Sequence, residues 1–349
     1  MKALELHGIH NLRLVDQPDP TPGPGEVLIR VNAVGVCGSD MHYYKEGSIG
    51  PDAAIRDGFI MGHEFAGVIE AVGEGISYRD FRAGDRVAAD PSVACGHCEF
   101  CEMGHPNLCL NLRFAGQPPD IDGALRQLMP WPAAVCFKLP DALTDADGAM
   151  LEPLGVALFA VDLGKVKVGD TVILVGCGPI GLLTLQCARL AGAGRIIALD
   201  KLAYRLKAAR DLGADDTLLV TGEGHVETVL DWTGGRGADV VFEAAGDNDA
   251  MRDAVELARR GGKVIYIGIP PNDYITFGSN SARRKGLTIK LVRRMKHTYP
   301  RAIRLVESGK IDVRSLVTHT YTLEEGPRAF DLVSVYADEV IKAIIEPNA

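Results

Sequence analysis

Gly176-Cys177-Gly178-Pro179-Ile180-Gly181 is the stretch that decides the fold. It follows an apolar run, TVILV (171–175), and opens a helical pattern that ends near residue 191. After a strand and before a helix, GxGxxG predicts a dinucleotide site. The first glycine permits the tight turn, the second lets backbone approach a pyrophosphate, and the third lets the helix pack closely. The alternative is an ordinary glycine-rich turn, which lacks this strand and helix context.

The next apolar run, RIIALD (195–200), ends at Asp200, nineteen residues beyond Gly181. A carboxylate at this point accepts hydrogen bonds from the ribose hydroxyls of NAD and repels the 2′-phosphate of NADP. We therefore predict NAD as the cofactor. Lys201 and Arg205 offer positive charge that a phosphate could use, so the preference for NAD is not absolute. The predicted cofactor contacts are Gly176, Gly178, Pro179, Ile180, Gly181, Asp200, Arg205, Ile267, Gly268 and Ile269.

Apolar runs alternate with helical patterns through the middle of the chain, which predicts a parallel α/β sheet. Further strands are expected at DTLLV (216–220), ADVVFEAAG (238–246), GKVIYIGI (262–269) and GLTIKLV (286–292), with a helix at AMRDAVELARR (250–260). With TVILV and RIIALD these make six strands, a complete doubly wound sheet.

The first 150 residues follow a different pattern. Short β-rich runs such as EVLIRVNAV (26–34) and FAGVIEAVG (65–73) are separated by Gly, Pro and Asp, as in a barrel-like β domain. After residue 292 a helical segment and a strand-like one, DEVIKAIIEP (338–347), form a tail that we expect to return to this domain. The predicted domains are residues 1–154 with 293–349, and residues 155–292.

Composition narrows the class of partner. Apolar residues make up 47% of the chain and the net charge is −9, so we expect a folded protein that binds neither nucleic acid nor an anionic membrane. The N-terminal residues lack a secretory signal pattern, and no run reaches the roughly 18 apolar residues of a membrane span. We therefore expect a cytoplasmic protein with a small-molecule partner, in which clustered cysteines bind metal.

Four cysteines, Cys95, Cys98, Cys101 and Cys109, lie within fifteen residues among turn-forming glycine and proline. Four thiolates at this spacing predict a tetrahedral zinc site. The site would be structural, because four protein ligands leave no open position. Disulfides and an iron–sulfur cluster are the alternatives.

A second constellation brings together Cys37, His63 and Glu64. Three protein ligands and one open position are typical of catalytic zinc. Taken singly, each residue has an ordinary explanation, as a buried thiol, a capped histidine or a surface acid. The combination with the quartet and the dinucleotide motif favours metal binding, and we predict two zinc ions per chain.

With these motifs in place, the sequence resembles the zinc-containing medium-chain dehydrogenases, in the polyol branch that includes sorbitol and xylitol dehydrogenases. The resemblance runs through nearly the whole chain. It is carried by VCGSDMHYY, GHEFAGVIEAVG, GDRVA, the cysteine lobe, QPPDIDG, KLPD, LEPLGVAL, GCGPIGLL and RRMKHTYP. It implies a Rossmann cofactor domain joined to a GroES-like catalytic domain, and a homo-oligomer, either a tetramer or a dimer.

The resemblance also implies roles for single residues. Cys37, His63 and Glu64 would hold catalytic zinc, with Glu152 beside the ion, either as a ligand or through a bound water. Ser39 and His42 would pass the substrate proton to solvent; the alternative for His42 is an ordinary surface histidine.

Substrate contacts follow from the resemblance too. They would come from Tyr43, Phe114, Gln117 and Arg294, although Arg294 could instead pair with cofactor phosphate. Gln117 and Met295 depart from the pattern of the animal enzymes, which leaves the particular polyol open.

We expect zinc-assisted oxidation of a secondary hydroxyl of a sugar alcohol by NAD, giving a ketose. The nearest alternative is a smaller secondary alcohol such as 2,3-butanediol or L-threonine. A zinc-ribbon binding protein and a non-catalytic member of the family are less favoured, because the dinucleotide motif and all three catalytic ligands are present.

Overall fold

The computed structural model describes residues 1–50, 53–76, 80–118, 121–272 and 274–349, and it divides into two compact units. The first unit comprises Met1–Glu152 and Tyr299–Ala349, and the second comprises Pro153–Thr298. Two residues of the QPPDIDG motif, Pro119 and Asp120, lie outside the described residues.

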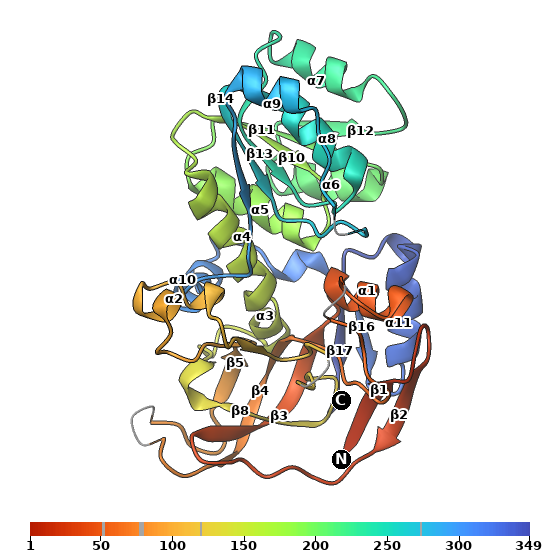
Figure 1. Cartoon of the computed structure of the whole chain (residues 1–349). Coiled ribbons are helices and arrows are strands. Elements are labelled where there is room, and N and C mark those ends of the chain that lie inside the picture. Colours follow the sequence, from red (N-terminus) through yellow and green to blue (C-terminus); the bar gives the residue numbers. More distant parts are fainter. Residues whose placement is uncertain (51–52, 77–79, 119–120, 273) are drawn as a thin grey trace. The chain divides into compact units, whose positions relative to one another are not determined.

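The second unit contains a six-stranded parallel sheet with the order β12-β11-β10-β13-β14-β15 (Figure 1). Helices α5 and α6 cover one face, while α7, α8 and α9 pack together on the other. This is the doubly wound order, so the predicted fold class is confirmed. The strands are β10 (Thr171–Val175), β11 (Arg195–Asp200), β12 (Asp216–Leu219), β13 (Ala238–Glu243), β14 (Ala258–Tyr266) and β15 (Thr288–Leu291). The helices are α4 (Leu151–Gly164), α5 (Pro179–Leu190), α6 (Ala203–Asp211), α7 (His225–Trp232), α8 (Asn248–Leu257) and α9 (Ser279–Lys285).

One predicted boundary in this unit is wrong. The helix expected over residues 250–260 ends at Leu257, and β14 begins with Ala258, which pairs with Ala238 of β13. Helical periodicity continues through Arg259 and Arg260, but two glycines follow at 261–262 and favour the end of a helix. Pairing with the neighbouring strand therefore overrides the local pattern.

The first unit is built on a seven-stranded sheet with the order β16-β17-β3-β4-β5-β9, in which β8 also pairs with β3. The C-terminal β17 runs antiparallel to β3, so the end of the chain joins the N-terminal strands. The strands are β1 (Lys2–Leu6), β2 (Leu12–Asp16), β3 (Glu26–Gly35), β4 (Glu64–Val72), β5 (Arg86–Ala89), β6 (Ser92–Val93), β7 (Arg113–Phe114), β8 (Leu128–Pro132), β9 (Cys136–Lys138), β16 (Val317–Thr322) and β17 (Lys342–Glu346). The helices are α1 (Gly38–Glu46), α2 (Glu99–Glu102), α3 (Asp145–Ala149), α10 (Tyr299–Glu307) and α11 (Gly326–Ser334).

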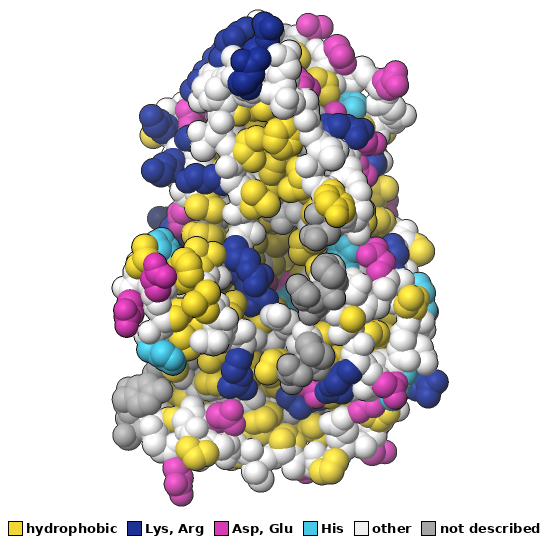
Figure 2. Space-filling model, viewed as in Figure 1, with side chains coloured by type: hydrophobic (Ala, Val, Ile, Leu, Met, Phe, Trp, Pro, Cys, Tyr) yellow, Lys and Arg dark blue, Asp and Glu magenta, His cyan; other side chains and the backbone are white. Residues whose placement is uncertain are grey.

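Basic side chains gather over α9 (Figure 2), whose last turn carries Arg283, Arg284 and Lys285. Cations at this position face the negative end of the helix dipole, which gives them a structural role. Among the described residues, every helix is too short or too polar to cross a bilayer.

Asp239, near the start of the central strand β13, forms ion pairs with two arginines. Its carboxylate accepts from Arg236, from Arg259 and from the peptide N–H of Thr171, the last at 2.9 Å. Although burial opposes the effect, these partners lower the pKa of Asp239 below its ordinary 3.8. A carboxylate with a lowered folded-state pKa stabilises the fold above its unfolded pKa, and the contribution is lost as the pH falls further.

We therefore expect Asp239→Asn to reduce the free energy of unfolding by about 1–3 kcal/mol at pH 7, because charge-assisted hydrogen bonds are lost. The deficit should shrink as the pH falls from about 5 towards 2, because the Asp239 carboxylate of the unfolded wild-type chain becomes protonated over this range, before that of the folded protein. Urea unfolding at a series of pH values measures this. A deficit that stays constant down to pH 2 would contradict the assignment.

Candidate active site

Two groups of metal-binding side chains stand out among the described residues. They are the cysteine quartet and the set Cys37, His63 and Glu64, and within each group the donor atoms lie within 4.8 Å of one another. Both groups were expected from the sequence, and both lie in the first unit.

The pairing of β3 with β4 assembles the three-residue set. Cys37 is the N-cap of α1, two residues after β3 ends, and Glu64 is the first residue of β4. Gly35 lies opposite Glu64 in the register, so the end of β3 is aligned with the start of β4. His63 and Glu64 are buried, and Cys37 is partly exposed. One thiol, one imidazole and one carboxylate with a partly open side fit a zinc ion that keeps a position for substrate.

Asp40 lies beside the imidazole of His63 and helps to hold it in place. It is fully buried, accepts from the Cys37 peptide N–H at 3.0 Å, and places Oδ1 3.5 Å from Nδ1 of His63. Burial opposes protonation of His63, but the charges of Asp40 and Cys37 raise its pKa well above the ordinary value. A carboxylate behind a ligand histidine fixes the ring orientation and increases its basicity. This role was not predicted from the sequence, although Asp40 lies inside the VCGSDMHYY motif.

Lys342 is the second residue that the sequence analysis missed. Its side chain is 2% exposed, and its ammonium forms an ion pair with Oε2 of Glu64 and donates to the carbonyl of Val36 at 3.0 Å. Burial lowers the pKa of Lys342, but Glu64 and Cys37 outweigh this and raise it above its ordinary value. The one available signal was a lysine that opens strand β17 directly before its apolar residues 343–345.

Glu152 lies in the first turn of α4 and is 4% exposed. Burial, with the charges of Glu64 and Asp90, raises its pKa to about 7, while His63 opposes the shift. In the described part of the chain its carboxylate is not among the donor atoms within 4.8 Å of one another. Glu152 is therefore buried near the metal ligands, and the charges of His63 and Glu64 act on its carboxyl group.

Ser39 and His42 lie three residues apart on α1. The Ser39 hydroxyl is 3.4 Å from Nε2 of His63, so it reaches the metal ligands. His42 Nδ1 is 3.2 Å from Glu46 on the next turn, and these side chains are 21% and 43% exposed. The helix thus carries polar groups from the buried ligands towards solvent.

The predicted substrate residues occupy different surroundings. Phe114 is buried with its ring centroid 5.3 Å from that of His63. Tyr43 belongs to the core and packs edge-on against Phe59, and Gln117 forms a bridge with Ile121. Arg294 lies in the second unit, with a positive φ of 56°.

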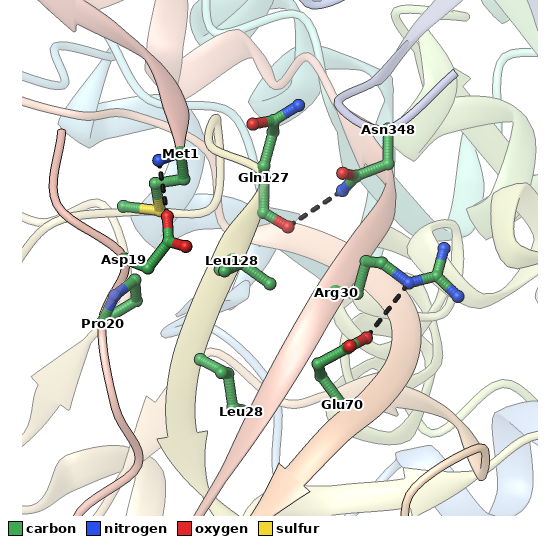
Figure 3. Close-up of a pocket in the computed structure, with 9 residues that line it drawn as sticks. All are labelled: Met1, Asp19, Pro20, Leu28, Arg30, Glu70, Gln127, Leu128 and Asn348. Carbon is green, nitrogen blue, oxygen red and sulfur yellow. Dashed lines mark hydrogen bonds and ion pairs between the residues drawn. The ribbon is translucent and has the colours of Figure 1, made fainter. Parts of the chain in front are cut away.

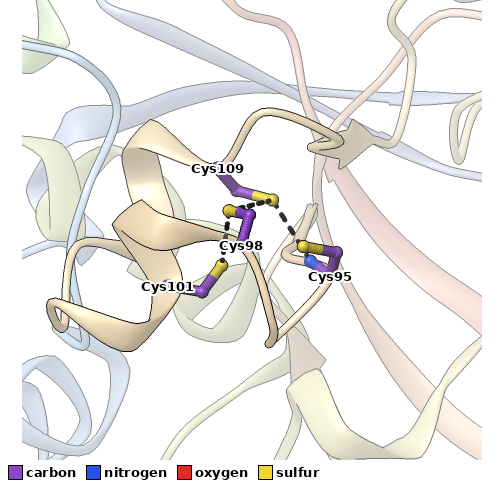
Figure 4. Close-up of side chains that lie close together, drawn as sticks. All are labelled: Cys95, Cys98, Cys101 and Cys109. Carbon is purple, nitrogen blue, oxygen red and sulfur yellow. Dashed lines mark hydrogen bonds between the residues drawn. The ribbon is translucent and has the colours of Figure 1, made fainter.

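The cysteine quartet closes around one point (Figure 4). The Cys98 sulfur lies 3.5 Å from that of Cys101 and 3.8 Å from that of Cys109. The peptide N–H groups of Leu110 and Cys101 lower the pKa of Cys98 to about 6, which favours the thiolate that binds metal. All four thiols are unpaired, as metal binding requires.

We expect Cys98→Ser to remove about one zinc ion per chain and to lower the melting temperature by roughly 5–10 °C, because the lobe loses its internal cross-link. Metal analysis combined with thermal unfolding measures both effects. A variant that retains about two zinc ions and the wild-type melting temperature would exclude this site.

The glycine-rich turn has the conformation that dinucleotide binding needs. Gly176 has a φ of +94°, and a Cβ on Gly181 would collide with the Gly176 carbonyl. Asp200 ends β11 and accepts from the peptide N–H groups of Cys177 at 2.7 Å and Leu202 at 2.8 Å, so its carboxylate is fixed beside the turn.

Side chains and loops around this turn belong to the same sheet edge. Arg205 brings its guanidinium within 3.7 Å of where a Gly178 Cβ would lie. Lys201 instead pairs with Asp247 at 3.1 Å. Ile267, Gly268 and Ile269 directly follow β14.

A groove of about 550 Å³ lies elsewhere on the first unit (Figure 3). It contains the Arg30–Glu70 ion pair and the N-terminal ammonium bound to Asp19. Its lining residues are Met1, Asp19, Pro20, Leu28, Arg30, Glu70, Gln127, Leu128 and Asn348, and none of them belongs to the predicted site.

A doubly wound sheet, a β-rich unit and two clusters that fit zinc together define a zinc-binding dehydrogenase. The chain belongs to this family: residues 23–141 match the alcohol dehydrogenase GroES-like domain, and residues 179–308 match the zinc-binding dehydrogenase domain.

Relatives match over nearly the whole chain. A sorbitol dehydrogenase of Bacillus subtilis is 37% identical over 100% of this chain and 98% of its own length. An L-idonate 5-dehydrogenase of Vitis vinifera is 37% identical over 93% of this chain and 88% of its own length. A crystal structure of an Escherichia coli oxidoreductase of unknown specificity has a TM-score of 0.91 and 34% identity, covering 99% of this chain and 98% of that one.

Proposed function

We propose that this protein is an NAD- and zinc-dependent polyol dehydrogenase, which oxidises a secondary hydroxyl of a sugar alcohol to the ketone of a ketose. The observation that carries the proposal is the buried set Cys37, His63 and Glu64, whose donor atoms lie within 4.8 Å of one another. It supplies three ligands and leaves a position for substrate, unlike the four-thiolate lobe.

The substrate class is supported by relatives named for polyhydroxylated molecules, sorbitol and L-idonate, at 37% identity. The cofactor is supported by Asp200. Its fixed carboxylate is suited to ribose hydroxyls and repels a 2′-phosphate. Lys201 forms an ion pair with Asp247, which partly neutralises its charge. Its attraction for the 2′-phosphate of NADP is therefore weaker than the sequence suggested.

When bound, zinc supplies Lewis acidity that makes a hydroxyl easier to deprotonate. Cys37, His63 and Glu64 would hold it, and Asp40 orients the His63 ring. Glu152, buried near these ligands, would accept the released proton.

The alternative proton acceptor is Ser39, from which His42 and Glu46 lead outward along α1. Phe114 shields the imidazole with an apolar surface. We assign Tyr43, Gln117 and Arg294 to substrate recognition as part of this proposal.

The test is a substrate panel with the zinc-loaded protein, containing sorbitol, xylitol, L-iditol, 2,3-butanediol and L-threonine, each with NAD and with NADP. Reduction of the cofactor is followed by absorbance. We expect the highest kcat/KM with a polyol and NAD. Turnover of butanediol or threonine alone would replace the polyol assignment by the smaller-alcohol alternative, and absence of all turnover would contradict both.

We also propose a domain division, an oligomeric state and a cellular compartment for this protein. We assign residues 1–154 and 293–349 to the catalytic domain and residues 155–292 to the cofactor domain, acting as a tetramer or dimer in the cytoplasm. The cysteines of the described residues form no disulfide, which is compatible with a reducing compartment. Light scattering coupled to size exclusion measures the oligomer, and a monomer would contradict this part.

A further inference from the structure

A buried acid, Glu243, ends the central strand β13 in the second unit, which pairs directly with β14. It is fully buried, and the metal site does not use it. The chain on either side leads into two loops at the same edge of the sheet. Residues 244–246 follow β13, and residues 267–269 follow β14. In a doubly wound sheet this carboxyl edge is where a dinucleotide binds.

The side chain of Glu243 holds the first loop. Its Oε1 accepts from the peptide N–H groups of Ala245 at 2.8 Å and Gly246 at 2.7 Å. Its main-chain carbonyl accepts from Ile267 at 2.8 Å and from Gly268 at 3.2 Å, which belong to the second loop. One residue therefore fixes both loops by four hydrogen bonds.

The packing around these bonds is too close for side chains. A Cβ on Gly268 would collide with the Gly246 nitrogen and lie 2.8 Å from Oε2 of Glu243. A Cβ on Gly176, in the glycine-rich turn, would lie 2.7 Å from the Ala245 nitrogen. The loop 244–246 therefore packs closely against both the glycine-rich turn and the loop 267–269.

Burying this acid has a cost that an apolar residue would avoid. Burial and the nearby charge of Asp247 raise the pKa of Glu243 to about 7, although the N–H groups of Gly246 and Ala245 oppose the shift. Burial and the charge of Glu243 together raise the pKa of the neighbouring Tyr266 above its ordinary value. Simple packing at this position would favour a leucine or methionine. A carboxyl here is explained by its two bonds to the loop 244–246, against which the second loop packs through Gly268.

We propose that Glu243 is a positioning residue of the dinucleotide site, which sets the loops 244–246 and 267–269 against the cofactor. This inference rests on the proposed NAD-dependent function. It assigns Glu243 no contact with the reacting atoms. Its effect passes through the loop backbone, so the measured quantity is cofactor affinity and not zinc content.

The test measures the Kd of NADH by energy transfer from protein tryptophan in the zinc-loaded protein and its variants. Glu243→Ala removes the acceptor, and we expect it to weaken NADH binding about tenfold or more. Glu243→Gln keeps an oxygen for Ala245 and Gly246, so binding should stay within about threefold of wild type. Gly268→Ala displaces the same loops without altering Glu243 and should also weaken binding, which provides a second test if Glu243→Ala does not fold.

Asp239→Asn is the matched control, because Asp239 lies on the same strand at the end away from the loops. It should lower stability and leave the Kd of NADH unchanged. Wild-type affinity in Glu243→Ala or Gly268→Ala would overturn the inference, as would an equal loss in Glu243→Gln and Glu243→Ala. Failure of the wild-type protein to bind NADH would instead overturn the proposed cofactor, and the inference with it.

Discussion

Replacing Cys37 by alanine should abolish alcohol oxidation, with kcat/KM reduced about a thousandfold or more, equivalent to about 4 kcal/mol of transition-state stabilisation. The variant leaves only His63 and Glu64 to hold the ion, and the only soft ligand of the set is lost. Zinc content should fall from about two ions to about one per chain, because the quartet is untouched. Metal analysis and steady-state kinetics on the same preparation provide both measurements.

A matched control comes from Cys136, which is buried in the same unit and belongs to neither cluster. Cys136→Ala removes a more deeply buried thiol and should keep about two zinc ions and nearly full activity. Comparison with Cys98→Ser separates the two clusters further. Cys37→Ala and Cys98→Ser should each lose one zinc ion. Only Cys37→Ala should lose activity while its melting temperature stays near that of wild type. A Cys37→Ala variant that keeps its second zinc ion and its turnover would exclude this residue from the site.

Much of the fold could be predicted because its signals are local. Each parallel strand of the second unit is a short apolar run followed by a turn and a helical pattern, and GCGPIG marks the switch between the two periods. The end of α8 could not be predicted in this way. Helical periodicity continues to Arg260, but the pairing of Ala258 with β13 depends on a strand twenty residues away.

In the candidate site, too, the residues marked by local sequence could be predicted, and those that depend on distant contacts could not. Cys37, His63, Glu64 and the quartet could be identified because metal ligands combine rare residue types with fixed spacing. Asp40 and Lys342 carry no such spacing. Lys342 meets the carbonyl of Val36 across 306 residues of sequence, and only the pairing of β17 with β3 brings them together. Supporting residues act through tertiary contacts, so their role becomes visible only in the folded chain.

Lys342→Met should destabilise the protein by about 3–5 kcal/mol, because it leaves the buried Glu64 carboxylate without its ammonium partner. Methionine matches most of the lysine volume, so the loss reports charge more than packing. The loss should be larger in chelator-treated protein, where no zinc ion shares the negative charge of Glu64. Urea unfolding before and after chelation measures both values.

Two further variants show whether the buried charge is the cause. In Lys342→Met/Glu64→Gln the acid is neutral, so the double variant should recover much of the stability that Lys342→Met loses. Lys2→Met removes an exposed lysine paired with Glu324 and should leave the free energy of unfolding nearly unchanged. If Lys342→Met unfolds at the same urea concentration as wild type, the ion pair does not support Glu64. Equal losses in the single and double variants would assign the effect to packing of the lysine stem.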